Sequence, residues 1–170
     1  MGRRKADSYD LHAKNVFLTF SALPPRLSLE ALRDRLLQKV TPKDFTFGLE
    51  IHPERKRKPY HIHGLLEFED RFRTRDPRFF DVKYYNQVYH PNVQPARSKR
   101  KVLDYVIKDG MYITSRDEVR PEWRVILEDI TDRDEFCEAL VRAQKSPLQS
   151  YLGVKYLDEL WTRRNHHVSI

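Results

Sequence analysis

Two segments of alternating polarity, residues 45–51 and 60–68, constrain the fold of this chain more than any other feature. In the first, Phe45, Phe47 and Leu49 alternate with polar or small residues, and the same period of two continues in the second. Side chains that alternate in this way point to opposite faces of a β-strand. A charged turn separates the two segments, so they are predicted to form an antiparallel hairpin.

Shorter patterns predict further strands and helices. Residues 16–20 are a β-branched and aromatic run typical of a buried strand, and residues 79–89 are predicted to form another strand. Apolar residues at helical spacing predict helices over residues 29–39 and 98–109. The expected fold class is therefore α+β, an antiparallel sheet with flanking helices, followed by a C-terminal helical segment.

Charge and pattern divide the chain into three parts. Residues 1–14 are polar and basic and are expected to be a flexible lead-in. Residues 15–115 contain the predicted sheet, and residues 116–170 contain two further predicted helices. Residues 1–110 carry 23 Lys and Arg against 14 Asp and Glu, whereas the remainder carries 9 against 11. The basic excess of the first part favours a polyanionic partner, most simply nucleic acid, over an ordinary solvated surface.

Composition excludes several classes of protein. The sequence contains no run of 18 apolar residues, so no membrane-spanning helix and no membrane partner are expected. The first ten residues contain no apolar segment of the kind that a secretory signal requires. Cys137 is the single cysteine, which excludes an internal disulfide framework and a cysteine-rich zinc site.

His61 and His63 lie two residues apart in the second alternating segment, so their imidazoles point to the same face of the strand. If the hairpin is antiparallel, Glu50 near the end of the first segment lies beside His61. One carboxylate and two imidazoles can hold a divalent cation and leave positions for water and substrate. Two histidines at this spacing also occur in strands that bind no metal, and the spacing alone leaves that interpretation open.

Tyr105, Lys108 and Asp109 share one face of the helix predicted over residues 98–109, because positions three and four apart are neighbours. A tyrosine phenolate can attack a phosphodiester and keep the product attached as a phosphotyrosine. Lys108 can stabilise the phosphate or favour the phenolate form of the tyrosine. Asp109 can approach the metal or orient its ligands. A structural tyrosine followed by ordinary helix capping is the alternative interpretation.

Four motifs in a fixed order resemble those of one family. Phe17-Leu18-Thr19-Phe20 resembles its first motif, His61-Ile62-His63-Gly64 its second, and residues 105–110 its third. Residues 72–82, followed by residues 90–95, are similar to the additional motif of geminivirus and genomovirus members. The family is the replication initiator (Rep) proteins of small circular single-stranded DNA viruses, whose endonuclease domains are of the HUH type.

This resemblance implies a metal-dependent endonuclease that nicks single-stranded origin DNA, starts rolling-circle replication and later rejoins the strand. Tyr105 corresponds to the nucleophile that stays on the 5′ phosphate, and Lys108 to the lysine associated with it. The residues that correspond to the metal ligands, for Mn²⁺ or Mg²⁺, are Glu50, His61, His63 and Asp109. The resemblance also implies an RRM-like or ferredoxin-like fold and a location in the host nucleus.

Members of the family are typically longer and carry a helicase domain with a phosphate-binding Walker motif. No Gly-x-x-x-x-Gly-Lys-Ser/Thr sequence occurs in this chain. A helicase domain is therefore expected only in a longer, full-length protein. Residues 116–170 resemble in position the oligomerisation region of geminivirus Reps, so a homo-oligomer is one expectation and helices packed on the core are the other.

DNA binding is expected to draw on three basic clusters. These are Arg55, Lys56, Arg57 and Lys58; Arg71, Arg73, Arg75 and Arg78; and Arg97, Lys99, Arg100 and Lys101. Tyr84, Tyr85 and Tyr89 can stack on unpaired bases, as aromatic side chains do in proteins that bind single strands. A competing hypothesis is a non-catalytic, RRM-like module that binds single-stranded nucleic acid. Such a module has no need of a carboxylate, two histidines and a tyrosine in these positions.

Overall fold

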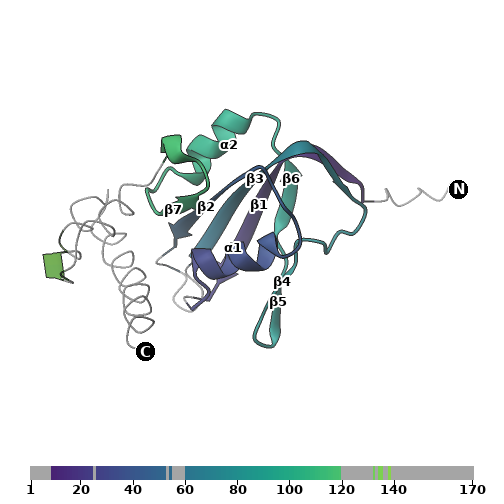
Figure 1. The fold of residues 1–170 in the computed structure, drawn as a ribbon. Helices are drawn as coiled ribbons and strands as arrows, with labels where there is room; N and C mark the ends of the chain where they lie inside the picture. Colours follow the sequence, from purple (N-terminus) through teal and green to yellow (C-terminus); the bar gives the residue numbers. More distant parts are fainter. Residues whose placement is uncertain are drawn as a thin grey trace, which may run out of the picture.

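The structure is a computed structural model that describes residues 9–24, 26–52, 54, 60–119, 132, 134, 135 and 138 (Figure 1). Its elements are β1 (Leu11–Leu23), α1 (Leu29–Leu37), β2 (Asp44–Ile51), β3 (Tyr60–Thr74), β4 (Val82–Tyr84), β5 (Gln87–Tyr89), β6 (Asn92–Pro95), α2 (Lys99–Val106), β7 (Tyr112–Thr114) and the 3₁₀ turn Asp117–Val119. The predicted α+β class is confirmed. Among the described residues, no helix has the length and apolar character that crossing a membrane would require.

Five strands form one antiparallel sheet in the order β6-β1-β3-β2-β7, with β3 at its centre (Figure 1). β2 and β3 are the two segments that alternate in the sequence, and they pair as the predicted hairpin. Their register sets Glu50 opposite His61 and Gly48 opposite His63. Because strand side chains alternate, a slip of one residue would move each of these side chains to the other face.

The two faces of the sheet are covered by different helices. On one face, Leu29, Leu32 and Leu36 of α1 are fully buried in a large cluster that includes Ile62 and Leu66 of β3. On the other face, Val106 of α2 packs in a smaller cluster with Leu65 of β3, Ala96 and, at its border, Phe17 of β1. Ser28 caps α1, because its side-chain oxygen accepts a hydrogen bond from the Ala31 amide at 3.1 Å.

The sheet begins earlier in the chain than the sequence indicated. β1 starts at Leu11, inside the predicted lead-in of residues 1–14, and Leu11 and Ala13 are buried. They pair with Thr74 and Phe72 at the far end of β3, which continues six residues beyond the predicted strand. The prediction missed these ends because residues 69–74 are mostly charged on the exposed side, which hides their apolar partners.

Residues 79–89 do not form the single strand that was predicted. They contain a turn followed by the short strands β4 and β5, which pair as a separate hairpin. The chain reverses near Tyr85, whose φ of 51° lies in the left-handed region and is incompatible with a continuous strand. β7 was not predicted, because three residues are too short to show a period.

The C-terminal part lies mostly outside the described residues, and so do the two helices predicted there and the basic residues 55–58. At Asp132, the side-chain carboxylate accepts hydrogen bonds from the backbone amides of Asp134 and Glu135, each at 3.0 Å. This is the arrangement of a helix N-cap, in which a side chain accepts from amides of the first turn.

Candidate active site

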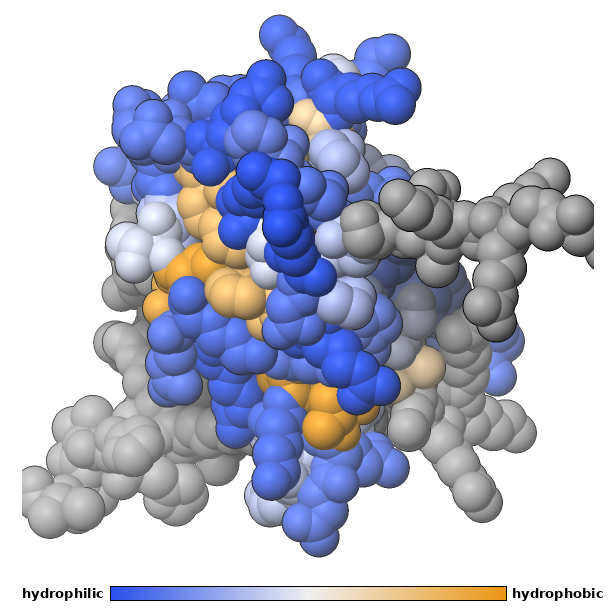
Figure 2. Space-filling view, turned by 90° about the vertical axis from the view of Figure 1, so that its right-hand side faces the viewer, coloured by the Kyte–Doolittle hydropathy of each residue, from blue (hydrophilic) through white to orange (hydrophobic). Residues whose placement is uncertain are grey.

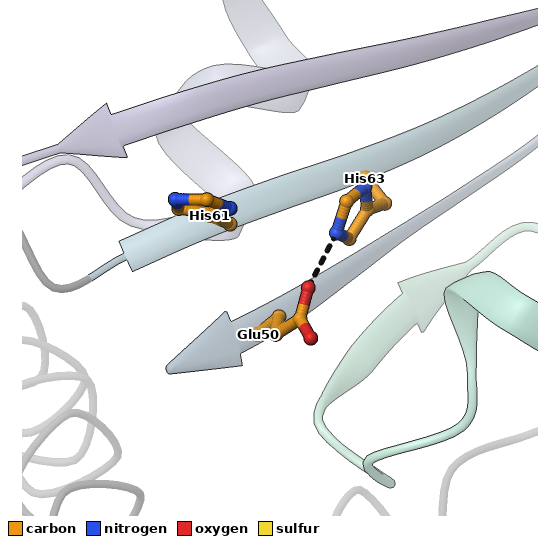
Figure 3. A group of neighbouring side chains, drawn as sticks. All are labelled: Glu50, His61 and His63. Carbon is orange, nitrogen blue, oxygen red and sulfur yellow. Dashed lines mark hydrogen bonds and ion pairs between the residues drawn. The ribbon is translucent and has the colours of Figure 1, made fainter. Parts of the chain in front are cut away.

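Glu50, His61 and His63 come together on the face of the sheet that α2 covers in part. One donor atom from each residue lies within 4.8 Å of the donor atoms of the other two. Figure 3 shows both histidines on β3 and Glu50 beside them on β2. The antiparallel register produces this group, since Glu50 pairs with His61 and the two histidines are two residues apart on the same face.

The Glu50 carboxylate lies between the Lys108 ammonium and the His63 imidazole. Its Oε1 atom accepts a hydrogen bond from Lys108 Nζ at 2.8 Å, and its Oε2 atom lies 2.8 Å from His63 Nε2 (Figure 3). Burial alone would raise the pKa of Glu50, but the hydrogen bonds from Lys108 and His63 outweigh it and lower the pKa to about 2. Glu50 is therefore an anion throughout the neutral range.

His63 is the most buried member of the group, with 5% of its surface exposed. Its Nδ1 atom lies 3.3 Å from the Thr19 hydroxyl, and its ring stacks on Phe17 with centroids 5.9 Å apart. Burial lowers the pKa of His63, although the hydrogen bond with Glu50 opposes that effect. A lowered pKa favours the neutral imidazole, which is the form that binds a metal.

These three residues fit a divalent cation. The set supplies one carboxylate oxygen and imidazole nitrogens, which are ligands that divalent cations accept. Glu50 and His61 are partly exposed whereas His63 is buried, so the group is open on one side. An open position is what a catalytic metal site needs in order to reach a substrate oxygen.

Tyr105 lies directly beside this group. Its ring centroid is 4.9 Å from that of His63 and 6.1 Å from that of Phe17, in edge-to-face arrangements. The side chain belongs to α2 and is 42% exposed, so the phenol can be reached from solvent. Lys108 Nζ lies 4.2 Å from the Tyr105 ring centroid, which is within cation–π range. The structure thus brings Tyr105, Lys108, Glu50 and both histidines into one site.

Lys108 stays positively charged in this site. Burial alone would lower the pKa of its ammonium, but the hydrogen bond and the charge of Glu50 raise the pKa above the usual value. The cation is shared between the Glu50 carboxylate and the face of the Tyr105 ring. Lys108 therefore connects the solvent-exposed Tyr105 to Glu50, which can bind the metal.

Close packing of α2 on the sheet gives Tyr105 its position. A Cβ atom at position 48 would lie 1.9 Å from the Val106 carbonyl oxygen, so only glycine leaves room for the end of the helix. Val106 itself is buried against Leu65. The helix then ends, and Gly110 adopts a φ of 77° that favours glycine.

Asp109, the fourth predicted ligand, is not a member of the group of three. Its negative charge is the smallest of the causes that act on the pKa values of His63 and Lys108. The arrangement fits the second of the two roles that the sequence suggested, in which Asp109 influences the site without supplying a donor atom to the group.

The predicted DNA-binding residues have different surroundings. Arg73 forms a bidentate ion pair with Asp10, with distances of 2.9 and 2.5 Å, and Lys99 pairs with Glu67 at 3.2 Å. Both cations therefore have structural partners. Both are nevertheless exposed, and so are the other predicted cations among the described residues, of which Arg75 also lies 4.0 Å from Asp10: Arg71, Arg75, Arg78, Arg97, Arg100 and Lys101.

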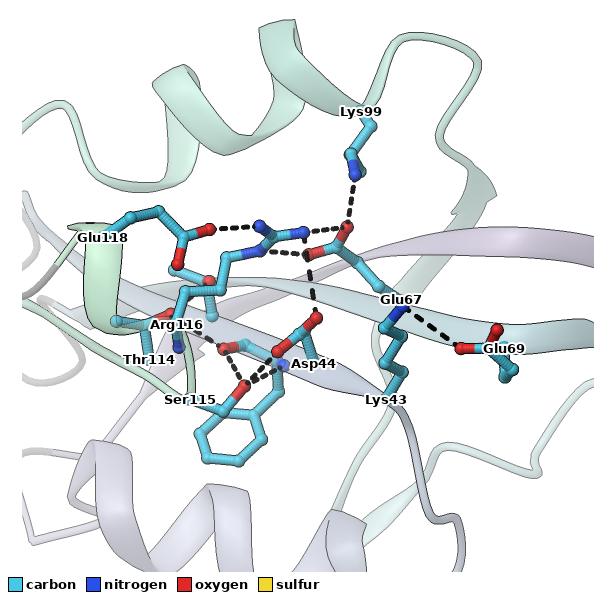
Figure 4. A network of polar contacts seen from close by, with 11 residues as sticks. Lys43, Asp44, Glu67, Glu69, Lys99, Thr114, Ser115, Arg116 and Glu118 are labelled. Atoms are coloured by element: carbon cyan, nitrogen blue, oxygen red, sulfur yellow. Dashed lines mark hydrogen bonds and ion pairs between the residues drawn. The ribbon is translucent and has the colours of Figure 1, made fainter.

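A second charged cluster was missed by the sequence reasoning. We call it the Glu67 cluster; it comprises Asp44, Glu67, Lys99, Arg116 and Glu118 (Figure 4). Arg116 donates to both oxygens of Glu67, at 2.6 and 2.7 Å, and the Glu67 side chain is only 6% exposed. Burial would raise the pKa of Glu67, but the hydrogen bonds from Arg116 and Lys99 lower it. A charged residue between the apolar Leu65, Leu66 and Phe68 was the signal in the sequence.

Comparison with known proteins agrees with the motifs. Residues 9–122 match the sequence family described as "Geminivirus Rep catalytic domain". Replication-associated protein A of Tobacco yellow dwarf virus (strain Australia) is 34% identical over 151 residues, which cover 81% of this chain and 48% of the relative. The chain belongs to the geminivirus Rep catalytic domain family, as its motifs predicted.

Other relatives carry the same kind of name. Replication-associated protein A of Bean yellow dwarf virus is 34% identical over 149 residues, covering 78% of this chain and 47% of the relative. The protein of that name from Maize streak virus genotype B (isolate Tas) is 35% identical over 104 residues, covering 60% and 35%. The chain thus spans less than half the length of each of these relatives.

Proposed function

We propose that this chain is a metal-dependent endonuclease that nicks single-stranded origin DNA with Tyr105 and so initiates rolling-circle replication. The observation that carries the proposal is the 4.9 Å separation between the rings of Tyr105 and His63, because His63 belongs to the candidate metal group. Membership of the Rep catalytic domain family supports it. A binding module would gain nothing from a solvent-accessible tyrosine next to such a group.

In the proposed reaction, the Tyr105 phenol oxygen forms a bond to phosphorus while the bond between phosphorus and the 3′ oxygen breaks. The phenol loses its proton, the 3′ oxygen leaves and gains one, and the 5′ phosphate remains on Tyr105. A 3′ hydroxyl can reverse the step and rejoin a strand, because the phosphotyrosine preserves the bond. Lys108 contributes positive charge beside the ring, where negative charge develops on the phenol and phosphate.

A divalent cation, Mn²⁺ or Mg²⁺, would be held by Glu50, His61 and His63, and would polarise a phosphate oxygen and neutralise its charge. Glu50 is prepared for this role because it remains an anion down to a pH of about 2. Asp109 adds negative charge near the group, and we assign it an orienting role.

A groove beside the site offers a path for the DNA strand. It has a volume of about 480 Å³ and is lined by Phe17, Pro95, Val102, Arg97 and Lys101, among others. Phe17 links the groove to the site, since its ring contacts both His63 and Tyr105. Figure 2 shows that hydrophobic side chains on the face beyond β6 gather in small areas among hydrophilic ones. Cations next to apolar surface suit a strand that carries phosphates and unpaired bases.

The test is formation of a covalent adduct. The purified chain is incubated with a randomised single-stranded DNA library and Mn²⁺, and the products are separated on a denaturing gel. We expect an adduct with the wild type, and none with Tyr105→Phe or in the presence of a chelator. Sequencing of the DNA recovered from the adduct would also give the preferred nick site.

Tyr9→Phe is the matched control, because the Tyr9 hydroxyl is buried and has no hydrogen-bond partner among the described residues. It removes one phenol oxygen outside the site and should leave the adduct unchanged. An adduct that persists in Tyr105→Phe would overturn the assignment of the nucleophile. Binding of the library without any adduct would favour the non-catalytic alternative.

Three wider features are proposed on the strength of family membership alone. They are a location in the host nucleus, assembly into a homo-oligomer through residues 116–170, and a helicase domain in a longer form of the protein. Light scattering of the chain at several concentrations tests the second of them. A constant mass equal to the 20.5 kDa of one chain would argue against assembly in this region.

A further inference from the structure

A third histidine, His52, borders the candidate metal group. It follows Ile51, the last residue of β2, and lies two positions after Glu50 in the chain. Its ring centroid is 4.1 Å from that of His61. Its Nε2 atom lies 3.6 Å from Glu50 Oε2, the carboxylate oxygen that also faces His63.

The two ring nitrogens of His52 have different surroundings. Nδ1 lies 3.1 Å from Glu54 Oε1, and an ionised carboxylate can only accept, so Nδ1 is the donor. In the neutral ring, Nε2 then carries a lone pair. Nε2 is buried and makes no hydrogen bond within the described part of the chain.

In that tautomer the Nε2 lone pair of His52 faces Oε2 of Glu50 across 3.6 Å, and this oxygen already lies 2.8 Å from His63 Nε2. A buried acceptor without a donor is unfavourable, and a cation between the two atoms would bind the His52 nitrogen and attract the Glu50 carboxylate. The arrangement around His52 matches one that is common at metal sites, in which the imidazole binds the metal and its other nitrogen donates to a carboxylate.

We propose that His52 binds the same cation as Glu50, His61 and His63 through Nε2, with Glu54 holding the ring in the required tautomer. This inference rests on the proposed metal-dependent function and adds one nitrogen ligand to it. A donor set with three imidazoles and one carboxylate favours Mn²⁺ over Mg²⁺, because Mg²⁺ prefers oxygen ligands and transition ions accept imidazole. The proposal therefore also assigns to His52 a role in metal selectivity.

The test measures metal binding by the whole chain, without DNA. Calorimetric titrations with Mn²⁺ and with Mg²⁺ are compared for the wild type and His52→Ala. We expect His52→Ala to weaken Mn²⁺ binding by about 10- to 100-fold and Mg²⁺ binding by much less. Glu54→Gln, which keeps His52 but weakens its partner, should show a smaller loss for Mn²⁺ in the same direction.

Pulsed electron paramagnetic resonance of bound Mn²⁺ supplies a second readout, since couplings from coordinated imidazole nitrogens should decrease in His52→Ala. His12→Ala is the control, because it removes an exposed histidine of β1 and should change neither measurement. His63→Ala is the positive comparison and should lose binding of both metals.

The outcomes separate the two proposals. If neither the wild type nor His12→Ala binds Mn²⁺, the proposed metal-dependent function fails. If His63→Ala loses Mn²⁺ while His52→Ala keeps the wild-type affinity and nitrogen couplings, only the role of His52 is overturned. Equal losses for Mn²⁺ and Mg²⁺ in His52→Ala would refute the role in selectivity.

Discussion

Two carboxylates of the sheet, Glu67 and Glu50, each form an ion pair with a lysine in or next to α2. Their surroundings differ: Glu67 is enclosed by other charged side chains, whereas Glu50 belongs to the candidate metal group. Glu67 on β3 binds Lys99, the first residue of α2, and Glu50 on β2 binds Lys108, just beyond its last residue. The helix that carries Tyr105 is thus attached to the sheet near both ends. The two carboxylates differ in their burial and in their other partners.

Glu67 is buried beneath its own ion-pair partners. Arg116 occupies both of its oxygens, and the side chain is 6% exposed. Glu50 is 21% exposed, has one lysine and three histidines next to it, and can share its oxygen with a cation. The difference shows that the partners of a carboxylate decide its role. A guanidinium group that donates to both oxygens leaves neither of them for a ligand, whereas imidazoles beside a carboxylate can bind a metal ion together with it.

The largest effect on stability is expected at the closed site. Glu67→Ala leaves Arg116 and Lys99 without their shared acceptor, which should lower the free energy of unfolding by about 3 kcal/mol. The Mn²⁺ dissociation constant should stay unchanged, because the candidate ligands lie elsewhere on β2 and β3. Urea unfolding and metal titration of the same preparation measure the two quantities.

Glu69→Ala is the matched control for this change. Glu69 lies two residues further along β3, pairs with Lys43 at 3.2 Å, and its side chain is 73% exposed. Its loss should alter stability by about 0.5 kcal/mol or less. The comparison between the two sites breaks down if Glu67→Ala abolishes Mn²⁺ binding or costs no more than Glu69→Ala.

An intermediate effect is expected where α2 touches the sheet. Gly48→Ala introduces a Cβ atom 1.9 Å from the Val106 carbonyl oxygen, which forces the end of α2 away from β2. We expect a loss of about 2 kcal/mol in stability. A displaced tyrosine should also lower the initial rate of adduct formation by about 10- to 100-fold, while Mn²⁺ still binds.

Gly110→Ala separates displacement of the helix from the general cost of replacing a glycine. Among the described residues, apart from the two chain neighbours, no atom lies within 4 Å of a Cβ at this position, but the φ of 77° makes alanine unfavourable by about 1 kcal/mol. This variant should lose stability and keep most of its activity. Equal losses of adduct rate in both glycine variants would show that the contact at Gly48 does not position Tyr105.

The smallest effect is a dependence of stability on pH at the open site. The fold lowers the pKa of Glu50 from 4.5 to about 2, so the ionised carboxylate stabilises the folded chain above pH 4.5 and this contribution is lost as the pH falls toward 2. Solvent screening reduces it to about 1 kcal/mol at this partly exposed residue. Comparison of metal-free wild type with Glu50→Gln at about pH 6 and about pH 2.5 measures it.

The two proteins should differ at the higher pH and converge at the lower one. Glu67 and the other carboxyl groups titrate in both proteins, so their effects cancel in the difference. A difference that is the same at both pH values would mean that Glu50 stabilises the fold through its packing and not through its charge.

The sequence predicted the part of the site that depends on a regular period. Alternation in β2 and β3 was enough to place Glu50, His61 and His63 together, because register converts spacing along the chain into proximity in space. The helix pattern singled out Tyr105, and motif resemblance assigned it as the nucleophile. Lys108 does lie near Tyr105 and also reaches Glu50, but from the turn after α2, because the helix ends at Val106 and not at residue 109 as predicted.

The sequence did not predict features that depend on tertiary packing. Glu67 and Arg116 are 49 residues apart, and no local pattern connects them. His52 stands in a charged turn, where its direction depends on how the strand ends. The reversal at Tyr85 requires a left-handed backbone that tyrosine rarely adopts, so a continuous strand was the more natural expectation.

The contact at Gly48 has a consequence for how this site can change over time. The end of α2 packs directly on the main chain of β2, because the Val106 carbonyl oxygen occupies the space that a side chain at position 48 would fill. We therefore expect apolar side chains of the large core cluster to be exchangeable for others of similar volume with little movement of the end of α2. We expect the distance from the Tyr105 phenol to the candidate metal ligands to tolerate much sequence change elsewhere, in a chain that is 34% identical to one relative over 151 residues.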